Sequence, residues 1–183
     1  MICGWGSEAR VFASIAASVN RTEVRVLPDR LNMPTNDFRV TFRRNGEEPT
    51  HITCRPPVIS HNPEDAMKDV DIVVFMLPAH ANEDFLHDLR PYIEPGVIIV
   101  GLPGGPGFEL QVREALGDVM QQCTIMNFDS SPWVCNELGV DCEVLSTEEM
   151  LFGAIMVSFK HFSVGIHVWR LILEKFEEIS LVI

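Results

Sequence analysis

The sequence predicts an α/β protein with a doubly wound, mostly parallel sheet, an inserted β-hairpin and a C-terminal helical tail. Three observations predict this class. A glycine-rich turn lies between a strand and a helix at the start of the chain, continuous apolar strands then alternate with helical segments, and 46% of the 183 residues are hydrophobic. With 22% charged residues, the composition is typical of a globular core and excludes a disordered or collagen-like chain.

The first 27 residues predict a strand, a turn, a helix and a second strand. The short strand Ile2-Cys3 comes first, and the segment 7–17 (SEARVFASIAA) then has helical spacing and good helix formers. The segment 23–27 (EVRVL) alternates polar and apolar side chains as a strand does, and Pro28-Asp29 ends it. This order is that of the first unit of a Rossmann-type fold.

A β-hairpin is expected next. Apolar side chains alternate in the segments 38–42 and 52–54, on either side of a loop with Asn45-Gly46, a pair that favours hairpin turns. The side chains on the other face would lie in solvent, and a phosphate-facing role is the alternative. The arginines of that face are Arg39, Arg43 and Arg55.

From residue 63 onward, helices and apolar strands alternate, which predicts a parallel sheet buried on both faces. The expected helices are 63–69, 80–90 and 108–116, and the expected strands are 71–77, 97–100, 124–128 and 142–145. We expect one domain over residues 1–149. The apolar segment 150–183 is expected to form one or two helices, as the start of a further helical domain.

A G-x-G-x-x-A pattern lies at the start of the first expected helix. It is formed by residues 4–9, namely Gly4, Trp5, Gly6, Ser7, Glu8 and Ala9. Gly4 permits a tight turn, Gly6 lets the backbone approach a pyrophosphate, and Ala9 is small enough for the helix to pack on the strand. The helix N-terminus offers free N–H groups and a partial positive charge. The pattern predicts that residues 1–149 bind a dinucleotide; a purely structural turn is the alternative.

The residue that would bind the adenosine ribose is expected about 20 residues after this pattern. Asp29, two residues past the second strand, is the candidate, although it could simply be a turn residue after Pro28. Its neighbour Arg30 could instead meet a 2′-phosphate. The sequence therefore favours NAD as the cofactor and leaves NADP open.

The net charge of −12 is unevenly distributed: residues 1–60 carry 8 basic and 6 acidic residues, whereas residues 61–183 carry 6 and 20. Nucleic-acid binding requires clustered lysine and arginine, so we expect no nucleic-acid partner. An anionic small molecule would be tolerated better by the N-terminal part.

Five cysteines without a C-x-x-C pair or a zinc spacing predict buried, reduced thiols in a cytoplasmic protein and no metal site. The N-terminus has no basic region before an apolar stretch, so no signal peptide is expected. The apolar segment 150–173 is interrupted by Lys160, His161, His167 and Arg170, which is too often for a membrane span.

Five segments, in this order and spacing, resemble the N-terminal NAD-binding domain of the opine dehydrogenases, the octopine dehydrogenase group. They are ICGWGSEA followed by EVRVL, LPAHANEDF, VGLPGGPGFELQ, and SPWVC followed by EVLST, and together they cover most of residues 1–149. Members of this family condense the amino group of an amino acid with an α-keto acid, usually pyruvate, and reduce the imine with NADH.

The resemblance implies roles for particular residues. Gly4, Gly6 and Ala9 would hold the pyrophosphate, the segment Leu77-Pro78-Ala79 would lie against the nicotinamide half, and Ser130 stands where the family carries a threonine that faces the amino-acid substrate. The sequence also departs from the family: at Gly105 a polar residue that helps to hold substrate is missing. Three further positions differ in size or charge, namely Trp5, Glu8 and Asn136.

The resemblance implies an NAD(P)H-dependent oxidoreductase acting on a CH–NH bond, of which this chain supplies mainly the cofactor-binding domain. No catalytic residue is assigned, because the family's catalytic groups lie in a further helical domain. A helical partner or that domain would cover the apolar segment 150–183. Two alternatives are a non-catalytic dinucleotide-binding module and a related reductase resembling glycerol-3-phosphate dehydrogenases.

Overall fold

The computed structural model describes residues 1–19, 22–29, 37–43, 46, 48–55, 58–148 and 150–157. Its larger sheet has seven strands in the order β11 (Gly153–Val157), β8 (Thr124–Phe128), β7 (Ile98–Gly101), β6 (Ile72–Phe75), β1 (Ile2–Cys3), β2 (Arg25–Leu27) and β5 (Val58–Ile59). All neighbours are parallel except β11, which runs antiparallel to β8. The predicted doubly wound sheet is confirmed.

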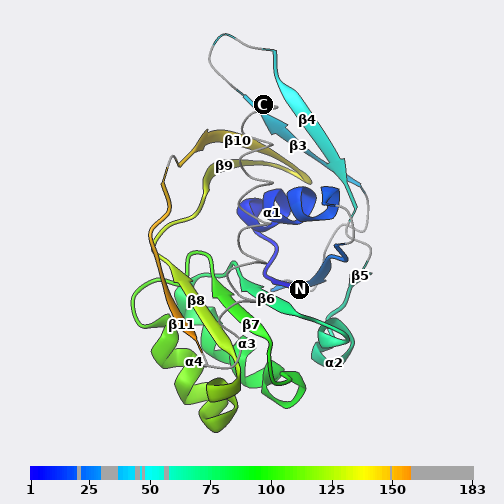
Figure 1. Ribbon diagram of the computed structural model, residues 1–183. Helices are drawn as coiled ribbons and strands as arrows, with labels where there is room; N and C mark the ends of the chain where they lie inside the picture. Colours follow the sequence, from blue (N-terminus) through cyan, green and yellow to red (C-terminus); the bar gives the residue numbers. More distant parts are fainter. Residues whose placement is uncertain are drawn as a thin grey trace.

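Helices cover both faces of this sheet (Figure 1). On one face lie α2 (Pro63–Met67), α3 (Asn82–Leu89) and α4 (Phe108–Leu116), with the 3₁₀ turns η1 (Ala79–Ala81), η2 (Arg90–Tyr92) and η3 (Gly117–Gln122) beside them. On the other face lies α1 (Ser7–Ser18). The expected helix 108–116 is confirmed with its bounds, and the expected helix 80–90 is divided between η1, α3 and η2.

A second sheet lies beyond α1, with the order β4 (Thr50–Cys54), β3 (Phe38–Phe42), β10 (Asp141–Thr147) and β9 (Trp133–Leu138). The antiparallel pair β3–β4 is the predicted hairpin. The strand expected at 142–145 exists within β10, where it pairs in parallel with β3 and antiparallel with β9. The strand β9 was not predicted, and it completes the sheet that covers α1.

The solvated face predicted for the hairpin is present on this second sheet. Arg39, Arg43 and Arg55 are all exposed. The side chain of Arg43 forms an ion pair with Glu143, and the backbone N–H of Arg39 donates to Asp141 at 2.7 Å. Arg39, through its backbone, and Arg43, through its side chain, therefore join β3 to β10 and stabilise the second sheet.

Two apolar clusters explain why the central strands are continuously apolar. Along and just before β7, Ile98 and Val100 pack into the cluster that contains α1 and the second sheet, whereas Val97 and Ile99 pack into the cluster under α2, α3 and α4. Alternate side chains thus point to opposite faces, and both faces are buried. The central strands are fixed by apolar packing from two sides.

The expectation of helices from residue 150 onward is wrong for Gly153–Val157, which form β11 at the edge of the large sheet. A Cβ atom at Gly153 would lie 2.8 Å from the ring of Phe128, so glycine lets the strand approach β8 closely. The sheet therefore continues past residue 149. The rest of the expected helical tail, residues 158–183, lies outside the described residues.

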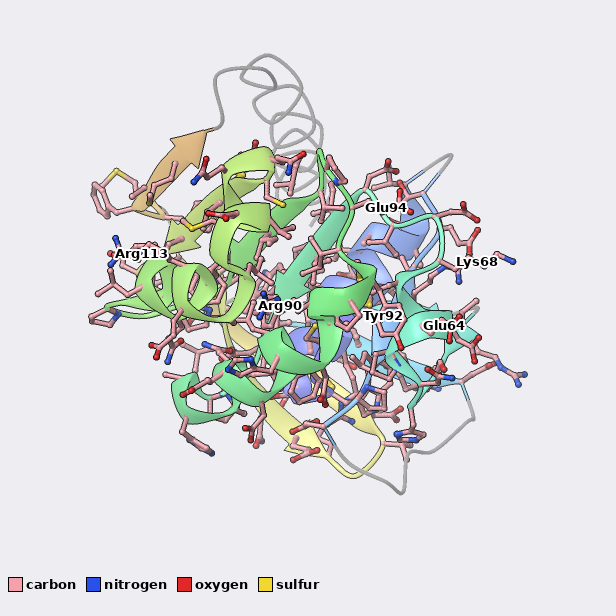
Figure 2. All side chains as sticks on the ribbon, turned by 90° about the horizontal axis from the view of Figure 1, so that it is seen from below. Glu64, Lys68, Arg90, Tyr92, Glu94 and Arg113 are labelled. Atoms are coloured by element: carbon pink, nitrogen blue, oxygen red, sulfur yellow. The ribbon has the colours of Figure 1, made fainter. Side chains whose placement is uncertain are left out.

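The outer face of the helical layer is charged. Figure 2 shows this layer from below, with Glu64 and Lys68 at α2, Arg90 and Tyr92 on η2, and Arg113 on α4. The helices α2 and α3 each begin with two acidic residues, which are favourable beside the partial positive charge of a helix N-terminus. No helix among the described residues is long and apolar enough to cross a membrane.

Candidate functional site

The predicted site residues lie at one edge of the large sheet because the strands that precede them are parallel and in register. Cys3, the last residue of β1, pairs with Leu27 on β2 and with Phe75 on β6. Gly101 on β7 pairs in turn with Phe75 and with Asn127 on β8. The chain leaves β1 toward β2 on one side and returns as β6 on the other, and ligands of such sheets bind where the strand order reverses.

The turn after β1 requires glycine at Gly4. Its φ is +101°, in the region that favours glycine, and its backbone N–H donates to Leu27 O at 2.9 Å. A Cβ atom here would lie 2.5 Å from Met76 O and 2.9 Å from the Leu77 side chain. The turn is therefore packed against the end of β6, at the point where the strand order reverses.

Gly6 contrasts with Gly4 because, apart from its two chain neighbours, no described residue comes within 4 Å of the position that its Cβ would take. Gly6 is the N-cap of α1 and makes no side-chain cap, so the first turn of the helix, which starts at Ser7, presents backbone N–H groups. Ala9, in contrast, is 1% exposed and packs into the core. The local geometry suits the approach of an anion at Gly6.

Trp5 connects this turn to two other elements. Its backbone N–H donates to Oδ1 of Asp29 at 3.1 Å, which brings the residue after β2 to the turn after β1. Its indole is 5% exposed and meets the ring of Phe38 on β3 edge to face, with 5.4 Å between the centroids. Asp29 itself is exposed. Arg30, the other candidate for the ribose end, lies outside the described residues.

Leu77, Pro78 and Ala79 follow β6 at the same edge. Leu77 is buried against the Gly4 turn, whereas Pro78 and Ala79 are exposed. The carbonyl oxygen of Ala79 accepts a hydrogen bond from Nε2 of Gln111 on α4 at 3.3 Å. The segment is therefore fixed by the packing of Leu77 against the Gly4 turn and by the hydrogen bond from α4.

The glycine-rich loop 101–107 after β7 is tightly packed at Gly101 and Gly104, whereas Gly105 and Gly107 have open space at their Cβ positions among the described residues. A Cβ atom at Gly101 would lie 2.5 Å from Gly104 Cα, and one at Gly104 would lie 2.2 Å from Oδ1 of Asn127. Nδ2 of Asn127 donates to Gly105 O at 3.0 Å and to Oε2 of Glu109 at 3.1 Å. The sequence analysis did not identify Asn127. It is a single polar residue in an apolar strand, and no sequence pattern indicates that it binds Gly105 and Glu109.

Ser130 lies just past the end of β8, half-buried, and its hydroxyl donates to Oδ1 of Asp129 at 3.1 Å. Next to it, the hydroxyl oxygen of Ser131 is buried and has no hydrogen-bond partner among the described residues. Both serines therefore stand at the same sheet edge as the glycine-rich loops, on the side of β6 to β8. The structure brings Ser130 to the edge where the other candidates lie.

The cysteines are not suited to nucleophilic or metal chemistry. All five are free, and four of them are buried. Burial raises the pKa of Cys3 to about 12 and that of Cys142 to about 11. Burial, and then the nearby carboxylate of Glu8, raise the pKa of Cys135 to about 12. The thiols are therefore protonated at neutral pH, and no group of three metal-ligating side chains occurs within the described part of the chain.

Comparisons with known proteins identify both similar sequences and similar structures. No protein-family model matches the chain. It is 40% identical over 164 residues, 84% of its length, to a tauropine dehydrogenase of Arabella iricolor, and 35% identical over 170 residues to an opine dehydrogenase of Haliotis discus hannai. The chain spans 41% and 42% of the length of these relatives.

Solved structures give the same result. An octopine dehydrogenase in complex with NADH and L-arginine is 32% identical, with a TM-score of 0.80 over 86% of this chain and 42% of that chain. A yersinopine dehydrogenase with bound NADP⁺ is 12% identical, with a TM-score of 0.69, and shows the fold alone. The resemblance to the opine dehydrogenases is therefore confirmed over about 85% of this chain.

Proposed function

We propose that this homologue of the opine dehydrogenases is the cofactor-binding part of an NAD(P)H-dependent enzyme that reduces the imine formed from an amino acid and an α-keto acid. The observation that carries the proposal is the open backbone at Gly6, at the N-terminus of α1 and beside the point where the strand order reverses. Sequence identities of 33–40% to tauropine, opine and octopine dehydrogenases support it.

The residues of the fingerprint fit a dinucleotide. At Gly6 the absent side chain leaves room for a pyrophosphate, and the free N–H groups of the first turn of α1, from Ser7 onward, would bind it. Gly4 keeps the turn tight, and Ala9 lets the helix lie close to the sheet. The bound cofactor would supply hydride to the imine carbon.

Asp29 would bind the adenosine ribose. One carboxylate oxygen accepts the Trp5 N–H, which fixes the side chain beside the fingerprint turn, and the other oxygen is left to accept a ribose hydroxyl. A carboxylate at this place repels a 2′-phosphate. We therefore propose that NAD is preferred over NADP, with Arg30 as the residue that would favour the reverse.

The other end of the cofactor would lie over β6, β7 and β8. Leu77, Pro78 and Ala79 would flank the nicotinamide half, and Ser130 would face the amino-acid substrate. No described residue is proposed as a catalytic acid or base. The groups that protonate the substrate would come from the part of the enzyme that this chain does not match, since the chain spans about 41% of its relatives.

Two coarser proposals accompany this function. We propose that the dinucleotide-binding unit extends past residue 149 to Val157, because β11 belongs to its sheet, and that residues 158–183 begin the next domain. That domain would cover exposed apolar side chains such as Met150 and Phe152. The five free cysteines favour a reducing compartment, so we propose that the protein is cytoplasmic.

The experiment that tests the function replaces Gly6 with valine. The valine side chain would occupy the space of the pyrophosphate, so G6V is expected to abolish NADH binding measured by titration of nicotinamide fluorescence. Because no described residue other than its chain neighbours lies within 4 Å of that site, the stability should fall only by the cost of losing an N-cap glycine, about 1 kcal/mol. Wild-type affinity for NADH in the variant would refute the fingerprint assignment, and wild-type protein that binds no dinucleotide would refute the function.

A further inference from the structure

We propose that Asn127 is a positioning residue for the nicotinamide end of the dinucleotide site, and this proposal rests on the function proposed above. Asn127 lies in β8, one of the strands at the sheet edge where the loops of the site meet. It touches no proposed ligand position itself. It acts through the loop 101–107, to which its amide is bound.

The amide of Asn127 is bound both to this loop and to the start of α4, and it packs against the loop at Gly104. Its Nδ2 donates both to Gly105 O at 3.0 Å and to Oε2 of Glu109 at 3.1 Å. Its Oδ1 is buried without a hydrogen-bond partner in the described residues, and it would lie 2.2 Å from a Cβ atom at Gly104. The loop therefore closes over the amide, and only glycine at position 104 permits that contact.

The fixed loop is also connected to the segment after β6. Glu109 stands in the first turn of α4, and two residues later Gln111 donates to Ala79 O at 3.3 Å. Main-chain atoms add a further link, because Gly104 N–H donates to Phe128 O at 3.2 Å. Asn127 on β8 is thus connected to the loop after β7 by hydrogen bonds, and through α4 to the loop after β6.

These two loops and β8 lie on one side of the reversal point only. The adenosine end would be bound on the other side, where Asp29 follows β2 and is held by Trp5 N–H. Nothing in the Asn127 contacts reaches Asp29, Trp5 or Gly6. A change at Asn127 should therefore alter binding of the nicotinamide ring and leave binding of the adenosine and pyrophosphate unchanged.

The test compares two ligands by isothermal titration calorimetry, NADH and ADP-ribose, which lacks the nicotinamide ring. In N127D the new carboxylate faces the Gly105 carbonyl and the Glu109 carboxylate, so it repels both and displaces the loop. We expect the affinity for NADH to fall about tenfold, and the affinity for ADP-ribose to remain within about twofold of wild type. Thermal unfolding of each variant is measured beside the titrations.

A second variant exchanges donor and acceptor. In E109Q/N127D the new glutamine amide can donate to the new aspartate carboxylate, which restores the hydrogen bond between α4 and β8 but not the one to Gly105 O, so NADH affinity should recover part of its loss. The variant N127S removes both hydrogen bonds without adding charge, and it serves if N127D does not fold. It should reduce NADH affinity less than N127D and again spare ADP-ribose.

Several outcomes would overturn the proposal. Equal losses for NADH and ADP-ribose would show that Asn127 supports the whole fold, and unchanged NADH affinity in both N127D and N127S would show that the loop does not act on the nicotinamide ring. Failure of the underlying function has a different signature, because wild-type protein would then bind neither ligand.

Discussion

Glycines in two loops at the same edge of the sheet serve opposite purposes. At the fingerprint turn, no described residue other than the chain neighbours of Gly6 comes within 4 Å of its Cβ position, so the missing side chain leaves space for a ligand. In the loop after β7, Cβ atoms at Gly101 and Gly104 would lie 2.2 to 2.5 Å from neighbouring atoms, so the missing side chains leave space for the protein itself.

The difference shows that a glycine-rich loop is not by itself a ligand-binding loop. The loop 101–107 contains four glycines within seven residues, against two within the first six residues of the chain. Two of the four, Gly101 and Gly104, are packed against neighbouring atoms, and only Gly105 and Gly107 are open among the described residues. Gly4 is a packed position, because a Cβ atom there would lie 2.5 Å from Met76 O, although the turn that it forms leads to the open position at Gly6. The space around each glycine, rather than their number, distinguishes a binding loop from a packed one.

The largest effect, on the free energy of unfolding, should come from an alanine at Gly104, a packed position in the loop 101–107. In G104A the new methyl group meets Oδ1 of Asn127 and the ring of Phe108, at 2.2 and 2.8 Å in the undistorted structure, and the asparagine is held by two hydrogen bonds. We expect a loss of about 3 kcal/mol in the free energy of unfolding and a melting temperature roughly 6–12 °C lower. Thermal unfolding followed by circular dichroism measures it.

The matched control is G6A, in the open turn. It adds the same methyl group where no described residue other than the chain neighbours lies within 4 Å, so its stability should fall by no more than about 1 kcal/mol, while its NADH affinity falls. A stable G104A beside an unstable G6A would reverse the comparison of the two loops.

A second, smaller effect is expected at Asp29, on the open side. In D29A the acceptor of the Trp5 N–H and of the proposed ribose hydroxyl is lost, so NADH affinity should fall roughly 10- to 100-fold. The isosteric D29N removes the charge and should narrow the difference between NADH and NADPH. Calorimetric titration with both cofactors measures the two effects. Unchanged NADH affinity in D29A would leave Asp29 as a turn residue only.

The smallest expected effect is an increase in the affinity for NADH when Glu8 is replaced by glutamine. Glu8 lies in the first turn of α1, near enough to Cys135 to raise the pKa of that thiol, and its charge would repel a pyrophosphate at the same helix end. E8Q should therefore bind NADH roughly two- to fivefold more tightly at low ionic strength. The gain should shrink as salt is added, because the two charges are then screened. A weaker binding of NADH by E8Q would mean that Glu8 does not face the cofactor.

Much of the fold could be predicted because its signals are local. The helix Phe108–Leu116 and the strand Thr124–Phe128 have the predicted bounds, since helical spacing in one and unbroken apolar residues in the other suffice to mark them. The turn at Gly4 and Gly6 was visible from glycine spacing and its place between a strand and a helix. The hairpin 38–54 was visible from alternation around a turn.

Other features have no local signal. The strand Gly153–Val157 lies in a segment whose apolar residues suit a helix as well as a strand, and its state depends on pairing with Thr124–Phe128. The second sheet depends on β10 pairing with β3, about 100 residues apart along the chain. Arg10 is buried on α1, where its guanidinium donates to the carbonyl oxygens of Gly139 and Val140, and no spacing in the sequence indicates that contact.

By itself, therefore, the sequence determined the order of most helices and strands as far as Phe128, the doubly wound sheet and the glycines of the first turn, because hydrophobic periodicity and the conformational preference of glycine act over a few residues. Only the tertiary structure decided which glycine is open and which is packed, that Asp29 meets the Trp5 N–H, and that Asn127 holds the loop 101–107. Those contacts join residues 22 to 24 positions apart, and their geometry exists only once the parallel strands have set the loops side by side.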